Sequence, residues 1–467
     1  MAELSLDMIL KATKGRLAGG SAPSLLQGVS TDSRNLPRGA LFVALRGERY
    51  DGHAFVDEAF DRAAGAALVS RRLAAPGPLI LVKDTLEALG ALAAAHRDSL
   101  SVRVIAITGS TGKTTTKEML ASILARGWHT GRTPGNYNNE IGVPLALLEL
   151  DASYRWAVVE MAMRGVGQIA YLSRMAQPHI GVVTNIGVSH LELLGSRESI
   201  AKTKAELLLS LPPDGAAVLN ADDEFFGFLK QQSTARVISF SQHGDADVRV
   251  EGIRVEADGR VSLELHGWWG KQEISLRMAG RHQALNAAAA ATAAMAAGAE
   301  PDWVASGLSE FEGAEMRGRI ARAPAGYTVI DDCYNAAPES MRVALELLAD
   351  LPGERKWAVL GDMKELGPMG ADWHREMGDF AAELKIDNLV AVGDLGRYIA
   401  QGARSRMSPS EVVEAPDNES AAAAVAEAIQ PGDVVLVKGS RAMQMEEIVR
   451  RLLGQPAPEQ SGETGDG

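Results

Sequence analysis

Short runs of β-branched and other apolar residues, each followed by a turn and then by a segment of helical spacing, recur along most of the chain. The runs occupy residues 102–108, 156–160, 180–184, 216–219, 328–332, 357–362, 388–394 and 433–439. Uninterrupted apolar runs that alternate with helices are typical of parallel strands covered by helices on both faces. The pattern therefore predicts an α/β fold with two such sheets in these parts of the chain.

Two segments depart from this rhythm. Residues 235–280 alternate apolar and polar positions, and the turn pair Asp258-Gly259 separates two such runs, which is typical of a β-hairpin. The alanine-rich stretch 287–297 is shorter than the roughly 20 residues that a membrane helix needs. We predict a buried helix of a globular domain there.

Composition narrows the class of protein. Apolar residues make up 46% of the chain and charged residues 23%, which excludes a disordered or collagen-like protein. Lys and Arg number 47 against 60 Asp and Glu, a net charge of −13, which argues against nucleic acid or an anionic membrane as the main partner. Cys333 is the single cysteine, and the N-terminus lacks the apolar segment of a signal peptide. We expect a cytoplasmic monomer without membrane insertion.

The strongest chemical signal is the segment Thr108–Thr116, TGSTGKTTT, between a predicted strand and a predicted helix at 117–127. Glycines allow backbone N–H groups to close around phosphate oxygens, and a helix N-terminus adds positive potential. Lys113 can reach the β- and γ-phosphates, and the Thr114 hydroxyl can ligate Mg²⁺. The segment is interpreted as a nucleotide-binding P-loop, although Ile107 stands where the usual pattern has its first glycine. The residues expected to hold ATP are Gly109, Ser110, Thr111, Gly112, Lys113, Thr114 and Thr115.

The length of 467 residues fits about three domains of roughly 150 residues each. We predict a small N-terminal α/β domain at 1–100, which includes the apolar run 41–47. A central ATP-binding domain with a P-loop ATPase-type parallel sheet (101–313) and a C-terminal Rossmann-like domain (314–455) follow. Residues 456–467 have almost nothing to bury and are predicted to be disordered.

Three further side chains permit either a structural or a chemical role. Glu160 ends a predicted strand at the sheet edge where ligands bind, so it is either a Mg²⁺ ligand or an ordinary solvated acid. His190 follows the next strand and is either structural or a metal ligand. Lys204 lies on the face of helix 198–208 that should pack inward, where an ammonium is paired, neutralised or modified, or extends to the edge of the core. Lys202 lies four residues from two glutamates and is expected to form solvent-exposed ion pairs.

Taken together, the motifs resemble those of the ATP-dependent Mur ligase family, over nearly all of the chain except the tail. The matching segments are 31–34, 41–45, 51–53, 108–119, 135–148, 158–169, 184–192, 220–223, 316–319, 331–341, 361–367 and 436–449. Within the family they are most similar to the members that add D-alanyl-D-alanine to UDP-N-acetylmuramoyl-tripeptide. The resemblance implies ATP and Mg²⁺ as cofactors, these two molecules as substrates, and activation of the tripeptide carboxylate as an acyl phosphate.

The resemblance also implies roles for individual residues. The implied catalytic residues are Lys113, Lys204 and His190. The implied metal ligands are Thr114, Glu160, His190 and Lys204, the last as a carbamate. The implied nucleotide contacts outside the P-loop are Asn286, Arg317 and Asp332, the last two reaching ATP when the third domain closes. The implied substrate contacts are Ser33, Arg34, Asn138 and Asn139.

The chain departs from the family pattern at two positions. Gln283 stands where an asparagine is usual, and Ala337 changes the common YNANP to YNAAP. Two other functions stay open at this point. One is a sister ligase that adds a single diamino acid, although its Asp-Asn-Pro-Arg motif is missing here. The other is a non-catalytic nucleotide switch, which would need only the P-loop.

Overall fold

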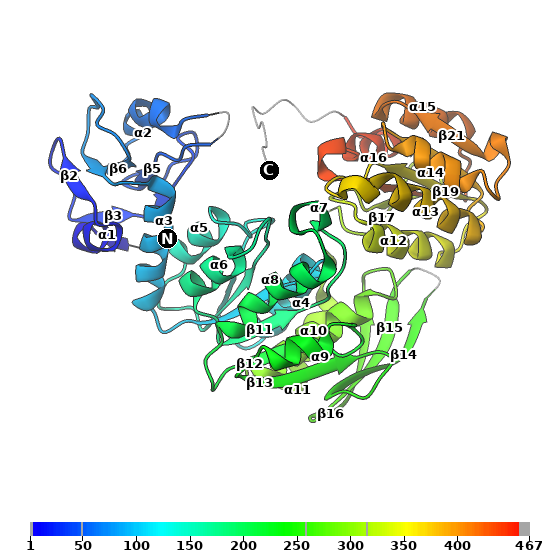
Figure 1. The fold of residues 1–467 in the computed structure, drawn as a ribbon, viewed down its shortest axis with the longest axis horizontal. Helices are drawn as coiled ribbons and strands as arrows, with labels where there is room; N and C mark the ends of the chain where they lie inside the picture. The colour runs from blue at the N-terminus through cyan, green and yellow to red at the C-terminus, as the bar shows by residue number, and fades with distance from the viewer. Residues whose placement is uncertain (1–2, 48–49, 257–258, 314–315, 457–467) are drawn as a thin grey trace.

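The computed structural model describes residues 3–47, 50–256, 259–313 and 316–456. Within these residues, helices and partly parallel strands build three main sheets in sequence order, so the predicted α/β fold is confirmed (Figure 1). Helices of the described residues are all too short or too polar to cross a bilayer. The predicted tail lies outside the described residues, apart from Pro456.

The N-terminal part holds a five-stranded sheet in the order β2-β7-β6-β5-β4, and β2 runs antiparallel to its neighbour while the other pairs are parallel. The strands are β2 (Arg16–Ala18), β4 (Val29–Ser30), β5 (Leu41–Val43), β6 (Ala66–Val69) and β7 (Leu79–Leu81). The helices are α1 (Leu6–Thr13), α2 (Val56–Asp61) and α3 (Thr85–Asp98), and β1 (Glu3–Ser5) pairs with β3 (Leu25–Gln27). The apolar run predicted at 41–47 is a strand in its first three residues.

The central part holds a nine-stranded sheet in the order β16-β15-β14-β13-β12-β11-β8-β10-β9. The strands are β8 (Arg103–Thr108), β9 (Thr130–Arg132), β10 (Trp156–Glu160), β11 (Ile180–Val183), β12 (Ala216–Asn220), β13 (Arg236–Ser241), β14 (Val248–Val255), β15 (Val261–Gly267) and β16 (Gly270–Leu276). The hairpin expected at 235–280 is confirmed by the antiparallel pairing of β14 with β15, although Asp258 lies outside the described residues. The hairpin joins the parallel strands edge to edge, so the central sheet is mixed rather than wholly parallel.

Helices cover both faces of this sheet because successive side chains of a strand point to opposite sides. Ile105 and Ile107 of β8 pack with the helices of one face, α4 (Lys113–Leu124), α10 (Gln283–Ala296) and α11 (Pro301–Glu310). Val104 and Ala106 face the other side, which is covered by α5 (Gly142–Leu148), α6 (Gln168–Ala176) and α8 (Arg197–Leu209). The alanine-rich helix is buried as predicted, since small side chains let α10 approach the sheet closely.

The C-terminal part holds a six-stranded sheet in the order β17-β18-β22-β19-β20-β21, parallel except for β17. The strands are β17 (Arg319–Arg322), β18 (Thr328–Asp331), β19 (Lys356–Gly361), β20 (Asn388–Val392), β21 (Val412–Ala415) and β22 (Val434–Lys438). The helices α12 (Pro338–Asp350), α13 (Gly370–Glu383) and α14 (Gly396–Ala403) cover one face, and α15 (Asn418–Ala428) and α16 (Glu446–Leu452) the other.

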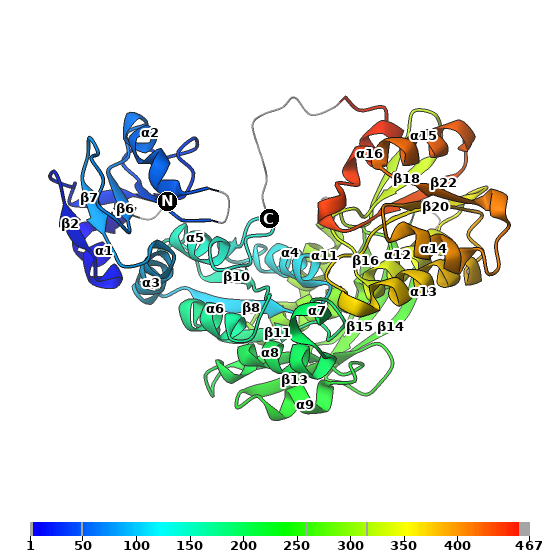
Figure 2. The same ribbon diagram turned by 45° about the horizontal axis from the view of Figure 1, so that its top comes forward.

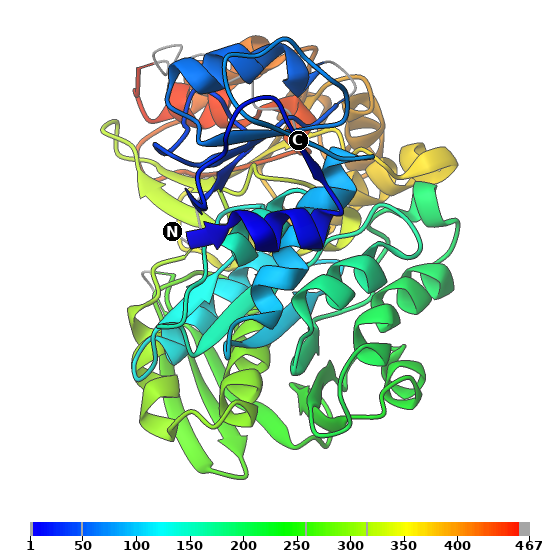
Figure 3. The ribbon, with the colours of Figure 1, turned by 90° about the vertical axis from the view of Figure 1, so that its left-hand side faces the viewer.

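The N-terminal and C-terminal parts lie apart from each other, on the same side of the central part (Figures 1 and 3). The view of Figure 2 shows the same separation, with the central helices α4 and α5 between the two outer parts. The short helix α7 (Leu191–Leu194) of the central part lies beside the C-terminal part (Figure 1). The carboxyl ends of the central strands, where ligands bind in such sheets, are therefore placed near a junction of domains.

Candidate active site

The P-loop, residues 108–116, leads from β8 into α4 and needs its glycines for space. Gly109 has φ +155°, and a Cβ there would collide with the Thr184 hydroxyl. Gly112 has φ +78°, and a Cβ there would collide with the Asn286 amide oxygen. Ile107 is buried inside β8, so the first glycine of this loop is Gly109. The position of the first glycine in the usual pattern therefore falls inside the strand here and not in the loop.

The segment that follows β11 holds the P-loop in shape. Asn185 accepts the Thr111 N–H at 2.9 Å and donates its amide to the Thr111 hydroxyl at 2.8 Å. Thr184 donates to the Thr111 carbonyl at 2.6 Å, and the Gly187 N–H donates to the Ser110 hydroxyl at 2.8 Å. The loop is thus held in place by protein contacts, with Ser110 and Thr111 serving its geometry. Asn185 was not among the predicted site residues, although its position just after a strand was an available signal.

Lys113 curls back over the loop that precedes it. Its ammonium donates to the Gly109 carbonyl at 2.8 Å and lies 3.3 Å from that of Ser110. Burial lowers the pKa of Lys113, Glu160 opposes this shift, and the positive charge of Arg317 adds to it. Arg317 belongs to the C-terminal part, so that part already lies near the P-loop in this structure.

Glu160 is buried at the carboxyl end of β10, which excludes the interpretation of an ordinary solvated acid. Its Oε2 accepts the Thr114 hydroxyl at 2.8 Å, and its Oε1 accepts the Asn138 amide at 2.8 Å. Carboxylate and hydroxyl oxygens suit a hard cation such as Mg²⁺. Among the described residues, there is no group of three or more His, Cys, Asp or Glu side chains that could hold a metal ion by itself. The donor set therefore fits Mg²⁺, an ion that commonly completes its shell with phosphate oxygens and water.

Lys117, which the sequence analysis did not single out, is fully buried in α4. Its ammonium donates to the carbonyls of Thr133 at 2.7 Å and Gly135 at 3.0 Å. It also lies 3.1 Å from Glu118 and 3.8 Å from Glu160. A buried charge that is fully paired in this way fixes the position of the carboxylate beside it.

Lys204 lies on the buried face of α8, as its spacing predicts. The helix begins at Arg197 because the Ser196 hydroxyl caps it by accepting the Ser199 N–H. Lys204 is 2% exposed and makes no hydrogen bond or ion pair with the part of the chain that the structure describes. Burial lowers its pKa well below the usual value, and the charge of Lys113 adds to this effect. The side chain is therefore buried and has no hydrogen-bond or ion-pair partner among the described residues.

Lys202 is exposed, as predicted, but the expected pair with Glu206 is wrong. Glu206 instead accepts backbone N–H groups at the start of α6, from Gly167 at 2.8 Å and Ala170 at 2.9 Å. A helix N-terminus offers unpaired N–H groups and positive potential, which attract a carboxylate.

His190 lies just before α7 with φ +65°, an uncommon conformation for a residue other than glycine. Its Nδ1 lies 2.7 Å from the Oε2 atom of Glu365, which belongs to the C-terminal part. The hydrogen bond with His190 lowers the pKa of Glu365. This contact joins two segments 175 positions apart and could not be predicted from the sequence pattern.

The expected nucleotide contacts of the C-terminal part lie at the same junction. The Arg317 guanidinium stacks 4.1 Å from the Tyr334 ring centroid, and Asp332 pairs with Lys438 at 2.6 Å. On the central side, the Asn286 amide donates to Gln283 at 2.9 Å. Gln283, one of the two departures from the family pattern, therefore helps to orient Asn286 beside the P-loop.

His282 provides a pH-dependent test of this junction. Burial lowers its pKa to about 4, while Asp332 raises it and Lys438 lowers it further. The unfolded chain takes up a proton near pH 6.5 and the folded chain only near pH 4, so stability is complete above pH 6.5 and falls as the pH drops toward 4. We expect the free energy of unfolding of His282→Gln to fall by about 1–2 kcal/mol less than that of the unsubstituted protein when the pH is lowered to 5. Melting temperatures of both proteins from pH 7.5 to 5 check this, and parallel curves would contradict it.

The expected substrate contacts occupy two places. Asn138 lies in the site through its bond to Glu160, whereas the Asn139 oxygen accepts the N–H groups that begin α5. Ser33 donates to Glu58 at 3.0 Å, and Arg34 pairs with Asp32 in the N-terminal part.

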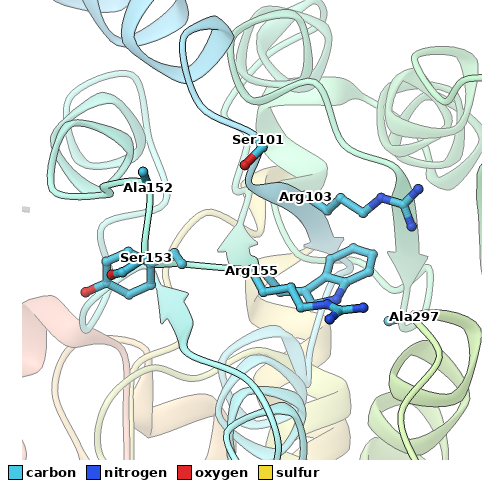
Figure 4. A pocket seen from close by; sticks show the side chains of 8 residues that line it. Ser101, Arg103, Ala152, Ser153, Arg155 and Ala297 are labelled. Carbon is cyan, nitrogen blue, oxygen red and sulfur yellow. The ribbon is translucent and has the colours of Figure 1, made fainter.

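A surface hollow of about 550 Å³ lies at the other end of the central strands (Figure 4). Arg103 and Trp156, the first residues of β8 and β10, contribute to its lining together with Arg155. The P-loop begins at the opposite, carboxyl end of β8. The hollow is therefore separate from the P-loop.

Models of three Mur ligase domains match the chain in order. The catalytic domain of the Mur ligase family matches residues 25–97, the Mur ligase middle domain matches 107–294, and the Mur ligase glutamate ligase domain matches 316–441. The middle-domain match contains the P-loop, Glu160, His190 and Lys204.

Relatives and solved structures match at nearly full length. A UDP-N-acetylmuramoyl-tripeptide–D-alanyl-D-alanine ligase of Bacillus subtilis is 36% identical and covers 98% of this chain and 100% of its own. A crystal structure of MurF from Acinetobacter baumannii is 34% identical, with a TM-score of 0.90 over 97% of this chain and 100% of its own. MurF ligase from Thermotoga maritima, solved with ADP, is 29% identical, with a TM-score of 0.82 over 92% of this chain and 97% of its own.

Proposed function

The chain belongs to the Mur ligase family, and we infer from this that it joins D-alanyl-D-alanine to UDP-N-acetylmuramoyl-tripeptide with the use of ATP. The product is the pentapeptide precursor of peptidoglycan. The observation that carries this function is the match of all three parts of the chain to relatives of that activity, 36% identical over 98% of the chain and 37% identical over 97%. A nucleotide switch would leave the N-terminal and C-terminal matches unexplained.

We propose a division of labour among the predicted domains. Residues 1–100 would bind the UDP substrate, with Ser33 and Arg34 among the contacts, and residues 101–313 would bind ATP. Residues 314–455 would bind the incoming dipeptide and contribute Arg317 to the nucleotide. Three substrates would then meet at the junction of the domains, where holding them in line supplies much of the rate enhancement.

The reaction proceeds in two displacements. An oxygen of the tripeptide carboxylate attacks the γ-phosphorus of ATP, the bond from this phosphorus to the β,γ-bridging oxygen breaks, and ADP leaves as the acyl phosphate forms. The amine of D-alanyl-D-alanine then attacks the carbonyl carbon, the amide bond forms, and phosphate leaves while the amine loses its proton. Because negative charge accumulates on phosphoryl oxygens, Lys113 and the N–H groups of the P-loop would stabilise the first step.

We propose that Thr114, Glu160, His190 and a carbamylated Lys204 hold Mg²⁺ beside these phosphates. When bound, Mg²⁺ would neutralise charge on the β- and γ-phosphate oxygens. The buried pair of Thr114 and Glu160 oxygens supports this, as does the unpaired, buried Lys204. An ammonium cannot ligate a cation, whereas a carbamate offers two oxygens. We also propose that the protein is a cytoplasmic monomer. The proposed location rests on the single cysteine and the acidic charge balance.

The identity of the amine substrate gives a direct test. We expect ADP release to depend on D-alanyl-D-alanine at least about tenfold more than on D-alanine, L-lysine or diaminopimelate, because a site built for a dipeptide leaves polar groups unpaired when half of it is missing. A coupled assay with UDP-N-acetylmuramoyl-tripeptide measures this. With UDP-N-acetylmuramoyl-dipeptide as acceptor, a single diamino acid should give no turnover. Equal stimulation by a single amino acid would favour the sister ligase.

A further inference from the structure

Glu365 brings a carboxylate from the C-terminal part to a histidine of the central part. It lies in the turn that follows β19, with φ +64°. Its Oε2 is 2.7 Å from His190 Nδ1, across the junction of the two parts. The contact joins residues that are 175 positions apart in the sequence.

Neighbouring contacts hold the two partners of this bond in place. The Glu192 N–H donates to the Glu365 carbonyl at 3.4 Å, and Gly367 (φ +59°) lies so close to Glu192 that a Cβ there would come within 3.3 Å of it. Glu339, at the start of α12, accepts the Val188 N–H at 2.6 Å. Residues 188–192, which lead into α7 and include its first two residues, are therefore held by two acids of the C-terminal part (Figure 1).

The direction of the His190–Glu365 hydrogen bond follows from its chemistry. An ionised carboxylate only accepts, so Nδ1 donates, and the opposite ring nitrogen, Nε2, is the one left to bind a cation. A carboxylate behind a histidine fixes the orientation of the ring and is a common partner of metal-binding histidines. The left-handed backbone of His190 is uncommon and needs support from its surroundings.

We infer that Glu365 is a positioning residue, which orients His190 toward the metal site when the C-terminal part docks on the central part. The inference rests on the proposed role of His190 as a Mg²⁺ ligand. It extends that role by assigning part of the metal site to another domain, through a residue that does not touch metal or substrate. Docking of the C-terminal part then completes the site in addition to bringing in Arg317.

Binding of Mn²⁺ as a probe for Mg²⁺ tests the inference without relying on turnover. The full-length enzyme with a non-hydrolysable ATP analogue is titrated with Mn²⁺, and free Mn²⁺ is measured by electron paramagnetic resonance. We expect Glu365→Ala to weaken Mn²⁺ binding by about 10–100-fold, as loss of such a supporting carboxylate typically does. Glu365→Gln should lose less, because its amide oxygen can still accept the Nδ1 N–H. Glu376→Ala is the matched control, since Glu376 pairs with Arg342 within the C-terminal part.

A double-mutant comparison separates the outcomes. In a His190→Ala background, Glu365→Ala should change Mn²⁺ affinity by less than about twofold, because its effect passes through His190. The inference would be overturned if Glu365→Ala weakened Mn²⁺ binding equally in both backgrounds, or if Glu365→Ala alone left Mn²⁺ affinity unchanged. Looser docking of the C-terminal part, seen by scattering, would not rescue it in either case. If His190→Ala itself bound Mn²⁺ normally, the proposed metal ligand would be wrong, and the inference would fall with it.

Discussion

Replacement of Lys113 by alanine is expected to reduce ATP-dependent ligation by about 10³-fold, the upper end of the loss when one group that stabilises transition-state charge is removed. Lys113 is the cation of the P-loop, and its ammonium is held over the loop by two backbone carbonyls. A phosphate would offer it stronger, charged acceptors. The measurement is ADP release with saturating tripeptide substrate and dipeptide.

The fold should survive this change. The side-chain hydrogen bonds of Lys113 go to backbone carbonyls of its own loop, so its truncation removes contacts within the loop. We expect the melting temperature to stay within a few degrees of the unsubstituted protein. Lys230→Ala, which changes an exposed lysine of the same domain, serves as the control and should keep full activity. A folded Lys113→Ala protein that ligates normally would show that the loop does not hold the phosphates.

Lys204→Ala is expected to lose about 10²-fold or more in ligation and to recover part of it with a small carboxylate. Burial holds the pKa of Lys204 well below its usual value, which favours the neutral amine, the form that reacts with CO₂ to give a carbamate and a proton. Without the lysine, acetate or formate can occupy the vacated anionic position. Activity is measured at increasing acetate concentration, with chloride at equal ionic strength for comparison.

Lys202 supplies the matched control for Lys204. It lies two residues away on the same helix but is exposed, and even an exposed helix ion pair would contribute only about 0.2–0.5 kcal/mol. Lys202→Ala should therefore stay within about twofold of full activity and show no response to acetate. An essential Lys202 beside a dispensable Lys204 would reverse the assignment of helix faces.

Local regularities explain which features could be predicted from the sequence. The apolar run of β8 and the glycines of the P-loop are each determined by residues that are close together in the sequence. The inward face of Lys204 followed from helical spacing alone. The strands β9 and β17 were missed because they are short and not uniformly apolar.

Features that could not be predicted from the sequence depend on contacts between distant segments. Lys117 occupies the first turns of α4, and its burial depends on the carbonyls of Thr133 and Gly135, which no spacing rule relates to it. The spacing of four residues predicts an ion pair between Lys202 and Glu206. The Glu206 carboxylate instead accepts N–H groups at the N-terminus of α6. Such choices are made by tertiary packing, which the local pattern does not encode.

The segment after β11 touches the P-loop at one end and the C-terminal part at the other. Thr184, Asn185 and Gly187 bond to the P-loop, while Val188 and His190 bond to the C-terminal part. Thermodynamic linkage then requires reciprocity: if docking tightens nucleotide binding by some factor, nucleotide must favour docking by that same factor. Nucleotide occupancy would consequently set the fraction of molecules in which the C-terminal part is already docked before the dipeptide arrives.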